Sequence, residues 1–176
     1  VRRPQTGAQP PVQKLGVLGA GLMGAGIAQV AAVAGIDVVL IDTSAEHVQA
    51  AKNKLVSALQ RTHGDKAEAI AARIQATADL QQLKDCDFVV EAVFEDRSVK
   101  ADLMQRAALA LGDVAPHFVW ASNTSTLPIS GLAAHWSDPQ RVIGMHFFSP
   151  VPRMPLLEII MGQQTSQETL ARTMDL

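Results

Sequence analysis

Short apolar runs alternate with longer segments of helical periodicity along most of the chain. The apolar runs are bounded by glycine, aspartate or serine, which is typical of buried strands. They predict strands over Leu15–Gly19, Asp37–Asp42, Asp87–Val93, Phe118–Ser122, Val142–His146 and Pro155–Met161. Helical spacing of apolar residues predicts helices over Leu22–Ala34, Ser44–Arg61 and Arg97–Leu111, and a further helix that runs to about Ile74. Strands separated by helices imply βαβ units and a doubly wound, mostly parallel sheet in an α/β fold.

Local signals mark where these elements end. Thr43 followed three residues later by Glu46 fits a capping box, so we assign Thr43 as the cap of the second helix. The break at 62–65 predicts that this helix and the next form a helical hairpin. Residues 1–13, with three prolines and three glutamines, are predicted to be a linker or tail. We therefore expect one domain over residues 14–176.

The composition excludes several classes of function. The chain has 176 residues, of which 48% are hydrophobic and 18% charged, so it suits a folded domain rather than a disordered protein. The net charge of −2 gives no general attraction to nucleic acid. A single cysteine rules out an internal disulfide framework, and we expect no metal site. No apolar run is long enough to predict a membrane span, and a cytoplasmic location is favoured.

A glycine-rich sequence joins the first predicted strand to the first helix. Gly19-Ala20-Gly21-Leu22-Met23-Gly24 fits the pattern G-x-G-x-x-G. In dinucleotide-binding domains the first glycine permits the turn, the second lets the backbone approach a pyrophosphate, and the third lets helix and strand pack closely. The same glycines fit a tight turn that binds nothing, but the strand before and the helix after favour dinucleotide binding.

Asp42 ends the second predicted strand and indicates which dinucleotide binds. An acidic residue about 20 positions after the glycine motif accepts hydrogen bonds from the ribose hydroxyls and repels a 2′-phosphate. No arginine or lysine follows until Lys52, so the sequence favours NAD over NADP. FAD uses the same glycine pattern, which by itself does not separate the two cofactors.

A second group of polar residues follows the later strands. Ser125 comes after one strand, His146 and Ser149 end the next, and Glu158 lies inside the last. Carboxyl ends of parallel strands face the ligand crevice, so we expect the first three on the cofactor side. Glu158 lies in an apolar strand, where an unpaired charge is costly, and His146 is its candidate partner. Such a pair suits a general base, although each residue alone also fits a structural role.

The segments GAGLMGAGIA, VVLIDTS, DFVVEAVFED, SNTSTLPIS and GMHFFSPVPRMPLLEII occur in this order from about Lys14 to the end of the chain. Together they resemble the NAD-binding domain of the 3-hydroxyacyl-CoA dehydrogenases. SNTS, HFF-x-P and a glutamate twelve residues after the histidine make this resemblance more specific than the glycine motif. EAVFED and HFFSPV look most like the dehydrogenase part of multifunctional fatty acid oxidation proteins.

The resemblance implies a Rossmann-type fold, NAD as cofactor, and oxidation of 3-hydroxyacyl-CoA to 3-oxoacyl-CoA in fatty acid β-oxidation. It implies that His146 is the general base, that Glu158 is its partner, and that Ser125 hydrogen-bonds the substrate oxygen. The cofactor-binding residues that it implies are Gly19, Gly21, Leu22, Met23, Gly24, Asp42, Val93, Phe94, Glu95, Lys100 and Ser149. Many relatives have asparagine where this chain has Ser149.

The resemblance also implies partners. The helical hairpin is expected to meet the CoA moiety, with Lys52 and Lys54 as candidates for its phosphates, although a solvated helix face explains both lysines equally well. The family adds a C-terminal helical domain that covers the acyl-CoA site and forms the dimer interface. Because that domain is absent, we expect a fragment with weak turnover, flanked in the parent chain by hydratase and helical domains.

Two other functions fit parts of the pattern. A stand-alone module that senses NAD or NADH needs the glycine motif and Asp42, but not His146, Glu158 and Ser125 together. A different NAD-dependent 3-hydroxyacid dehydrogenase, acting on a small free acid, shares the glycine motif. HFFSPV followed by the later glutamate is not expected in such an enzyme.

Overall fold

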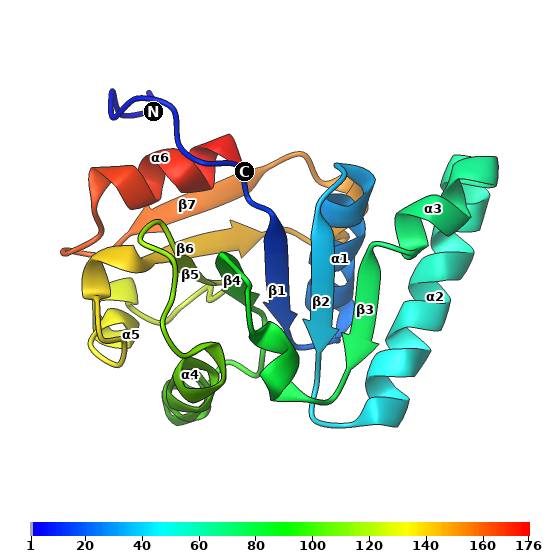
Figure 1. The fold of residues 1–176 in the computed structure, drawn as a ribbon, viewed down its shortest axis with the longest axis horizontal. Helices are drawn as coiled ribbons and strands as arrows, with labels where there is room; N and C mark the ends of the chain where they lie inside the picture. The colour runs from blue at the N-terminus through cyan, green and yellow to red at the C-terminus, as the bar shows by residue number, and fades with distance from the viewer. Residues whose placement is uncertain (1) are drawn as a thin grey trace.

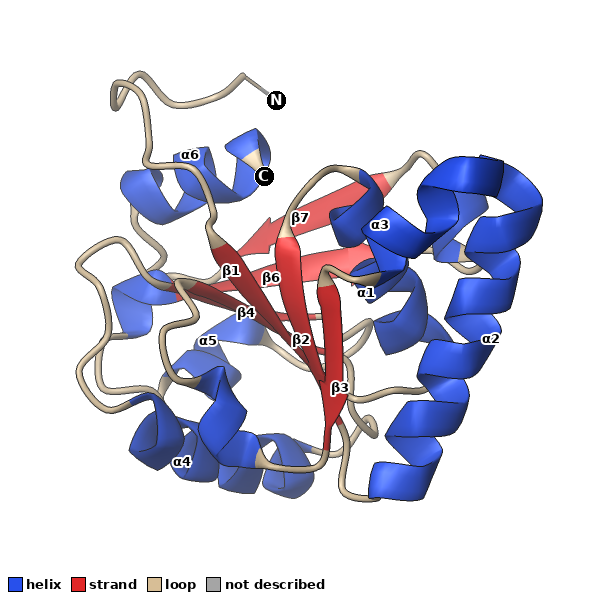
Figure 2. Ribbon diagram, turned by 45° about the vertical axis from the view of Figure 1, so that its right-hand side comes forward, coloured by secondary structure: helices blue, strands red, loops and turns tan. Residues whose placement is uncertain are grey.

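The computed structural model describes residues 2–176, in which seven strands form one sheet with the order β3-β2-β1-β4-β5-β6-β7 (Figures 1 and 2). The strands are β1 (Lys14–Leu18), β2 (Asp37–Ile41), β3 (Ile74–Thr77), β4 (Phe88–Glu91), β5 (Val119–Ser122), β6 (Val142–Phe147) and β7 (Leu157–Met161). The helices are α1 (Leu22–Val33), α2 (Ala45–His63), α3 (Ala67–Ala71), α4 (Arg97–Leu111), α5 (Ile129–Ala133) and α6 (Gln167–Asp175). All neighbouring strands are parallel except β6 and β7, which are antiparallel.

Helices cover both faces of the sheet, because the central strands are apolar on both sides (Figure 2). In β4, Phe88 and Val90 pack in the core beneath α1, α2, α3 and α6, whereas Val89 packs in the core beneath α4 and α5. All three side chains are fully buried. Successive side chains of a strand point to opposite faces, so a continuous apolar run specifies a strand buried on both sides. The predicted α/β fold with a mostly parallel sheet is confirmed.

Two local predictions after β2 are wrong. Ser44, not Thr43, caps α2, and its hydroxyl oxygen accepts a hydrogen bond from the backbone N–H of His47 at 3.2 Å. The second arm of the hairpin ends at Ala71, and Ile74 begins the edge strand β3 instead of ending a helix. Parallel pairing with β2 satisfies the backbone of this short strand, and such a distant partner leaves no local pattern in the sequence.

A buried ion pair holds the segment before β1 against α6. The Arg172 guanidinium lies 3.0 Å from the Asp87 carboxylate, and the two residues are 2% and 8% exposed. Arg172 also donates to the carbonyl oxygen of Pro10. Asp87 accepts hydrogen bonds from the backbone N–H groups of Gln13 and Lys14, both at 3.1 Å. The start of the sheet and α6, which lie side by side in Figure 1, are thus joined through one carboxylate.

Asp87→Asn is expected to lower the free energy of unfolding by about 3 kcal/mol, because it leaves a buried arginine without its anion. Urea denaturation at pH 7 measures the loss. The control is Asp102→Asn, which removes the carboxylate of the exposed pair Asp102–Arg106, 2.9 Å apart on α4. The control is expected to change stability by less than about 0.5 kcal/mol. Equal losses in the two variants would show that burial adds nothing to the Asp87 pair.

Candidate active site

The turn between β1 and α1 is shaped by close approaches that require glycine. Gly19 has φ +102°, and a Cβ there would lie 2.5 Å from the carbonyl oxygen of Ala92. A Cβ on Gly24 would lie 1.7 Å from the carbonyl oxygen of Gly19. A Cβ on Gly21 would have no atom of the described chain within 4 Å, apart from those of its immediate neighbours. Gly19 and Gly24 therefore close the turn, and Gly21 leaves the backbone open to a ligand.

Helix α1 begins behind this opening. Gly21 is its N-cap and has no side chain with which to satisfy the first N–H groups of the helix. The first turn, which the structure describes in full, carries no acidic side chain. Free N–H groups and the positive end of the helix dipole are thus directed at the open side of the turn. This arrangement fits the pyrophosphate of a dinucleotide.

Asp42 is fixed at the other side of the same turn. Its carboxylate oxygens accept hydrogen bonds from the backbone N–H of Ala20 at 2.8 Å and from that of Thr43 at 2.7 Å. The carboxylate also borders a cavity of about 80 Å³ whose apolar walls include Leu80 and Leu103. A carboxylate held beside a narrow apolar slot fits a ribose whose adenine lies in the slot.

A second cavity, of about 380 Å³, opens where β4, β5 and β6 end; we call it the strand-end pocket. It brings together seven of the residues predicted from the sequence: Met23, Val93, Glu95, Lys100, Ser125, His146 and Ser149. These residues come from segments far apart in the chain, and the parallel order of the strands places them at one edge. Phe94 is not among the described residues that line the pocket, and its side chain is 77% exposed.

His146 and Glu158 lie directly opposite each other on β6 and β7. Nδ1 of His146 is 3.0 Å from Oε1 of Glu158, so the expected pair is present. A carboxylate accepts but does not donate, so Nδ1 carries the proton and Nε2 is the nitrogen free to accept one. Glu158 lies in an apolar strand as expected, but its side chain is 55% exposed, because β7 is an edge strand. The ring of Phe148 packs 4.7 Å from the imidazole.

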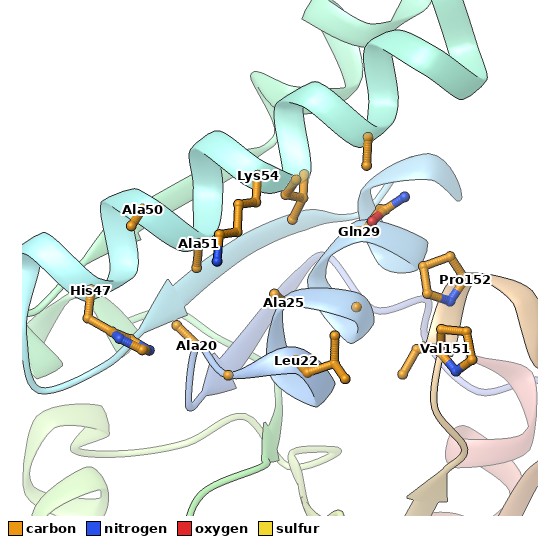
Figure 3. A pocket seen from close by; sticks show the side chains of 15 residues that line it. Ala20, Leu22, Ala25, Gln29, His47, Ala50, Ala51, Lys54, Val151 and Pro152 are labelled. Atoms are coloured by element: carbon orange, nitrogen blue, oxygen red, sulfur yellow. The ribbon is translucent and has the colours of Figure 1, made fainter.

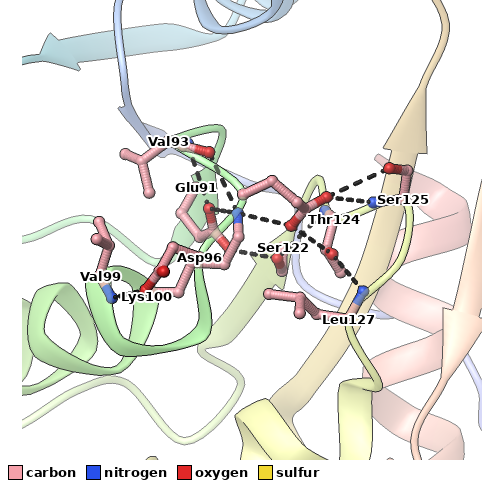
Figure 4. A network of polar contacts seen from close by, with 10 residues as sticks. Glu91, Val93, Asp96, Val99, Lys100, Ser122, Thr124, Ser125 and Leu127 are labelled. Carbon is pink, nitrogen blue, oxygen red and sulfur yellow. Dashed lines mark hydrogen bonds and ion pairs between the residues drawn. The ribbon is translucent and has the colours of Figure 1, made fainter.

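Polar contacts connect the loop after β4 to the loop after β5 (Figure 4). Glu95 accepts hydrogen bonds from the Ser125 backbone N–H at 2.9 Å, the Ser125 hydroxyl at 3.3 Å and the Thr124 hydroxyl at 2.7 Å. Burial alone would raise the pKa of Glu95, but these hydrogen bonds and the charge of Lys100 hold it below its ordinary value. Lys100 is 1% exposed and lies 2.8 Å from Glu91 and 3.6 Å from Glu95.

The sequence prediction missed two residues of this region. Asn123 lines the strand-end pocket, and its side-chain oxygen accepts a hydrogen bond from the backbone N–H of Phe147 at 2.9 Å. Glu91 is the buried partner of Lys100. An acidic residue inside an apolar strand was the signal that singled out Glu158, and the same signal is present at Glu91.

A cavity with mainly apolar walls lies between α1, α2 and the turn Val151–Arg153; we call it the helical groove (Figure 3). Its volume is about 480 Å³. Lys54 extends into the groove, and Leu22 also lines it. Lys52 instead donates to the backbone carbonyl of Ile74 at 2.7 Å, which gives this lysine a structural role.

The sheet, the glycine turn and Asp42 define an α/β domain of the dinucleotide-binding class. Residues 14–176 match the family described as "3-hydroxyacyl-CoA dehydrogenase, NAD binding domain", and the chain belongs to this family. Its cofactor is accordingly NAD. Within residues 2–176, no helix combines the length and apolar character that crossing a membrane requires.

The chain is similar to several named dehydrogenases. It is 46% identical over 162 residues to a probable 3-hydroxybutyryl-CoA dehydrogenase of Deinococcus radiodurans, covering 89% of this chain and 57% of that protein. The crystal structure of (S)-3-hydroxybutyryl-CoA dehydrogenase from Ralstonia eutropha has a TM-score of 0.85 and 39% identity, covering 93% of this chain and 59% of that one. The dehydrogenase part of a multifunctional enzyme from C. elegans has a TM-score of 0.83 and 29% identity, covering 98% and 41%.

Gly21→Ala is expected to leave the free energy of unfolding within about 1 kcal/mol of the wild type, because the added methyl group meets open space. The same methyl group would stand where the backbone approaches the pyrophosphate, so NADH affinity is expected to fall about tenfold or more. Gly24→Ala is the contrasting variant and is expected to lose about 3 kcal/mol of stability, because its methyl group meets a backbone oxygen. Urea denaturation and NADH fluorescence titration measure the two effects. Unchanged NADH binding by Gly21→Ala would contradict this role of the turn.

Asp42→Asn is expected to weaken NADH binding about tenfold and to reduce the preference for NADH over NADPH, because a charged acceptor of ribose hydrogen bonds is lost. Parallel fluorescence titrations with the two cofactors measure the change. Asp37→Asn is the matched control, since Asp37 is exposed at the opposite end of the same strand. A wild-type cofactor preference in the Asp42 variant would remove Asp42 from the ribose site.

Proposed function

We propose that this chain is the NAD-binding part of a longer enzyme that oxidises 3-hydroxyacyl-CoA to 3-oxoacyl-CoA. The observation that carries the proposal is the His146–Glu158 pair at the strand-end pocket, which Ser125 also lines. The chain spans 57% of the D. radiodurans relative, and the names of the similar proteins support a 3-hydroxyacyl-CoA substrate. An NAD-sensing module would need the glycine turn and Asp42, but not this pair.

In the proposed reaction Nε2 of His146 accepts the proton of the 3-hydroxyl group. Glu158 holds Nδ1 and stabilises the imidazolium that results, so the ring keeps one orientation through the transfer. Ser125 turns its one hydroxyl hydrogen from Glu95 to the substrate oxygen, while its backbone N–H keeps the hydrogen bond to Glu95. A bound NAD supplies the acceptor for the hydride that leaves C3. Val93, Glu95 and Ser149 line the same pocket and are proposed to contact the nicotinamide half of the cofactor, with the buried Lys100 supporting Val93 and Glu95.

The helical groove is the proposed contact for the CoA moiety. Its walls are mainly apolar, which suits a pantetheine chain, and Lys54 is the cation available for a phosphate. Of the two lysines considered from the sequence, Lys52 is occupied by a backbone carbonyl. The structure thus favours Lys54 over Lys52 for this role.

The wider setting of the enzyme is also part of the proposal. We place the reaction in fatty acid β-oxidation in the cytoplasm, in a parent chain with a C-terminal helical domain that encloses the substrate and forms a dimer. The likeness to the dehydrogenase part of a multifunctional enzyme supports a further hydratase domain in that chain.

His146→Gln in the full-length enzyme is expected to lower kcat about 100-fold or more, because the acceptor of the hydroxyl proton is lost. The affinity for NADH is expected to stay within about threefold of the wild type, since His146 is assigned to proton transfer rather than to cofactor binding. NADH formation from 3-hydroxybutyryl-CoA measures turnover. His135→Gln is the control, because His135 is not among the described residues that line the strand-end pocket. Wild-type turnover in His146→Gln would refute its role as base.

A further inference from the structure

Glu91 is a buried carboxylate that the proposed reaction does not use. It ends β4, is 1% exposed, and accepts hydrogen bonds from Lys100 Nζ at 2.8 Å, the backbone N–H of Val93 at 3.3 Å and the Ser122 hydroxyl. Burial raises the pKa of Glu91, and the charge of Lys100 opposes that rise. Buried ion pairs are often no more stabilising than apolar residues of the same volume. The place of this pair, directly beneath the strand-end pocket, therefore points to a role other than stability.

Lys100 connects Glu91 to the loop between β4 and α4. It lies in the first turns of α4, where a cation is opposed by the helix dipole, so the helix itself gives no reason for a lysine here. Its ammonium group has three hydrogens to donate. Nζ contacts Glu91, the carbonyl oxygen of Val93 at 3.3 Å and the carboxylate of Glu95 at 3.6 Å (Figure 4). The lysine thereby ties two points of the loop, at Val93 and Glu95, to the buried carboxylate of Glu91.

Glu91 and Lys100 are connected to the segment of Ser125 by two separate routes. Glu91 accepts a hydrogen bond from the Ser122 hydroxyl, at the start of the loop after β5. Glu95, which Lys100 contacts, accepts hydrogen bonds from the Ser125 backbone at 2.9 Å and from its hydroxyl at 3.3 Å. Two carboxylates thus hold the two ends of the segment 122–125. If the Glu91–Lys100 pair is broken, Ser122 loses its hydrogen-bond acceptor and Glu95 loses the cation that holds it.

We infer that Glu91 is a positioning residue: it fixes Lys100 and Ser122, and through them holds Glu95 and Ser125 in place in the strand-end pocket. This inference rests on the proposed function, because it assigns Ser125 a role in the reaction. Glu91 is not among the described residues that line the pocket, so it acts through its partners.

Hydrogen exchange on this chain tests the positioning without any assay of activity. Glu91→Gln keeps the shape of the side chain and removes its charge. Exchange of backbone amides in 123–127 is expected to accelerate about tenfold or more relative to the rest of the chain. Asp87→Asn is the matched control, because it breaks the other described buried pair, at the opposite end of β4, and should not act selectively on this segment. Equal protection of 123–127 in Glu91→Gln and wild type would overturn the inference.

Kinetics of the full-length enzyme give the second readout. Glu91→Gln is expected to lower kcat about 100-fold, because the catalytic group that it positions is displaced. Asp87→Asn is expected to keep the wild-type kcat when it is assayed well below the melting temperature of that variant. Where Glu91→Gln does not fold, Glu91→Asp replaces it, since it keeps the charge and shortens the side chain by one methylene. It is expected to shift both readouts in the same direction by a smaller factor.

The outcomes separate the two proposals. A wild-type kcat in the folded Glu91 variant would refute the positioning role and leave the proposed function standing. If the wild-type enzyme does not oxidise 3-hydroxyacyl-CoA, the proposed function fails, while the exchange experiment still decides whether Glu91 holds Ser125.

Discussion

The packing of backbone around Gly19 is the constraint on which the rest of the site depends. The N–H of Gly19 donates to the carbonyl of Ile41 at 2.8 Å, and a Cβ on Gly19 would collide with the carbonyl oxygen of Ala92. The ends of β1, β2 and β4 therefore meet at one glycine. This meeting brings the glycine turn, Asp42 and the loop after β4 within reach of a single dinucleotide. A side chain at Gly19 or Gly24 would separate these segments before any ligand could bind.

Strand β4 carries a buried carboxylate at each end, and the two serve different parts of the molecule. Asp87, just before the strand, joins the N-terminal segment to α6 through Arg172. Glu91, at its end, joins the loops that frame the strand-end pocket through Lys100 and Ser122. An unpaired charge in either place would be costly, so each carboxylate fixes its partners in definite positions. The loops at the carboxyl edge of the sheet are thus held by polar contacts that lie among mainly apolar buried residues.

The reversal of direction between β6 and β7 creates the His146–Glu158 pair. In an antiparallel pair of strands, the side chains of directly opposite residues lie close together. His146 and Glu158 are such a pair, although they are twelve positions apart in the chain. The edge position of β7 leaves Glu158 open to solvent, so its charge costs little, while His146 remains at the pocket. The family to which the chain belongs gives this geometry its chemical meaning, and the proposed reaction follows from the two together.

The sequence by itself determined most of the strand and helix pattern, the glycine turn, the acidic residue that follows β2 (Asp42) and the family. Each of these rests on local spacing or on contiguous motifs. The tertiary structure alone decided the features that depend on distant partners. These are the edge strand β3, the helix α5, the buried pair of Glu91 and Lys100, and the backbone carbonyl that Lys52 contacts. Glu91 and Glu158 give the same local signal, an acid in an apolar strand. Only the positions of their strands within the sheet make one buried and the other exposed.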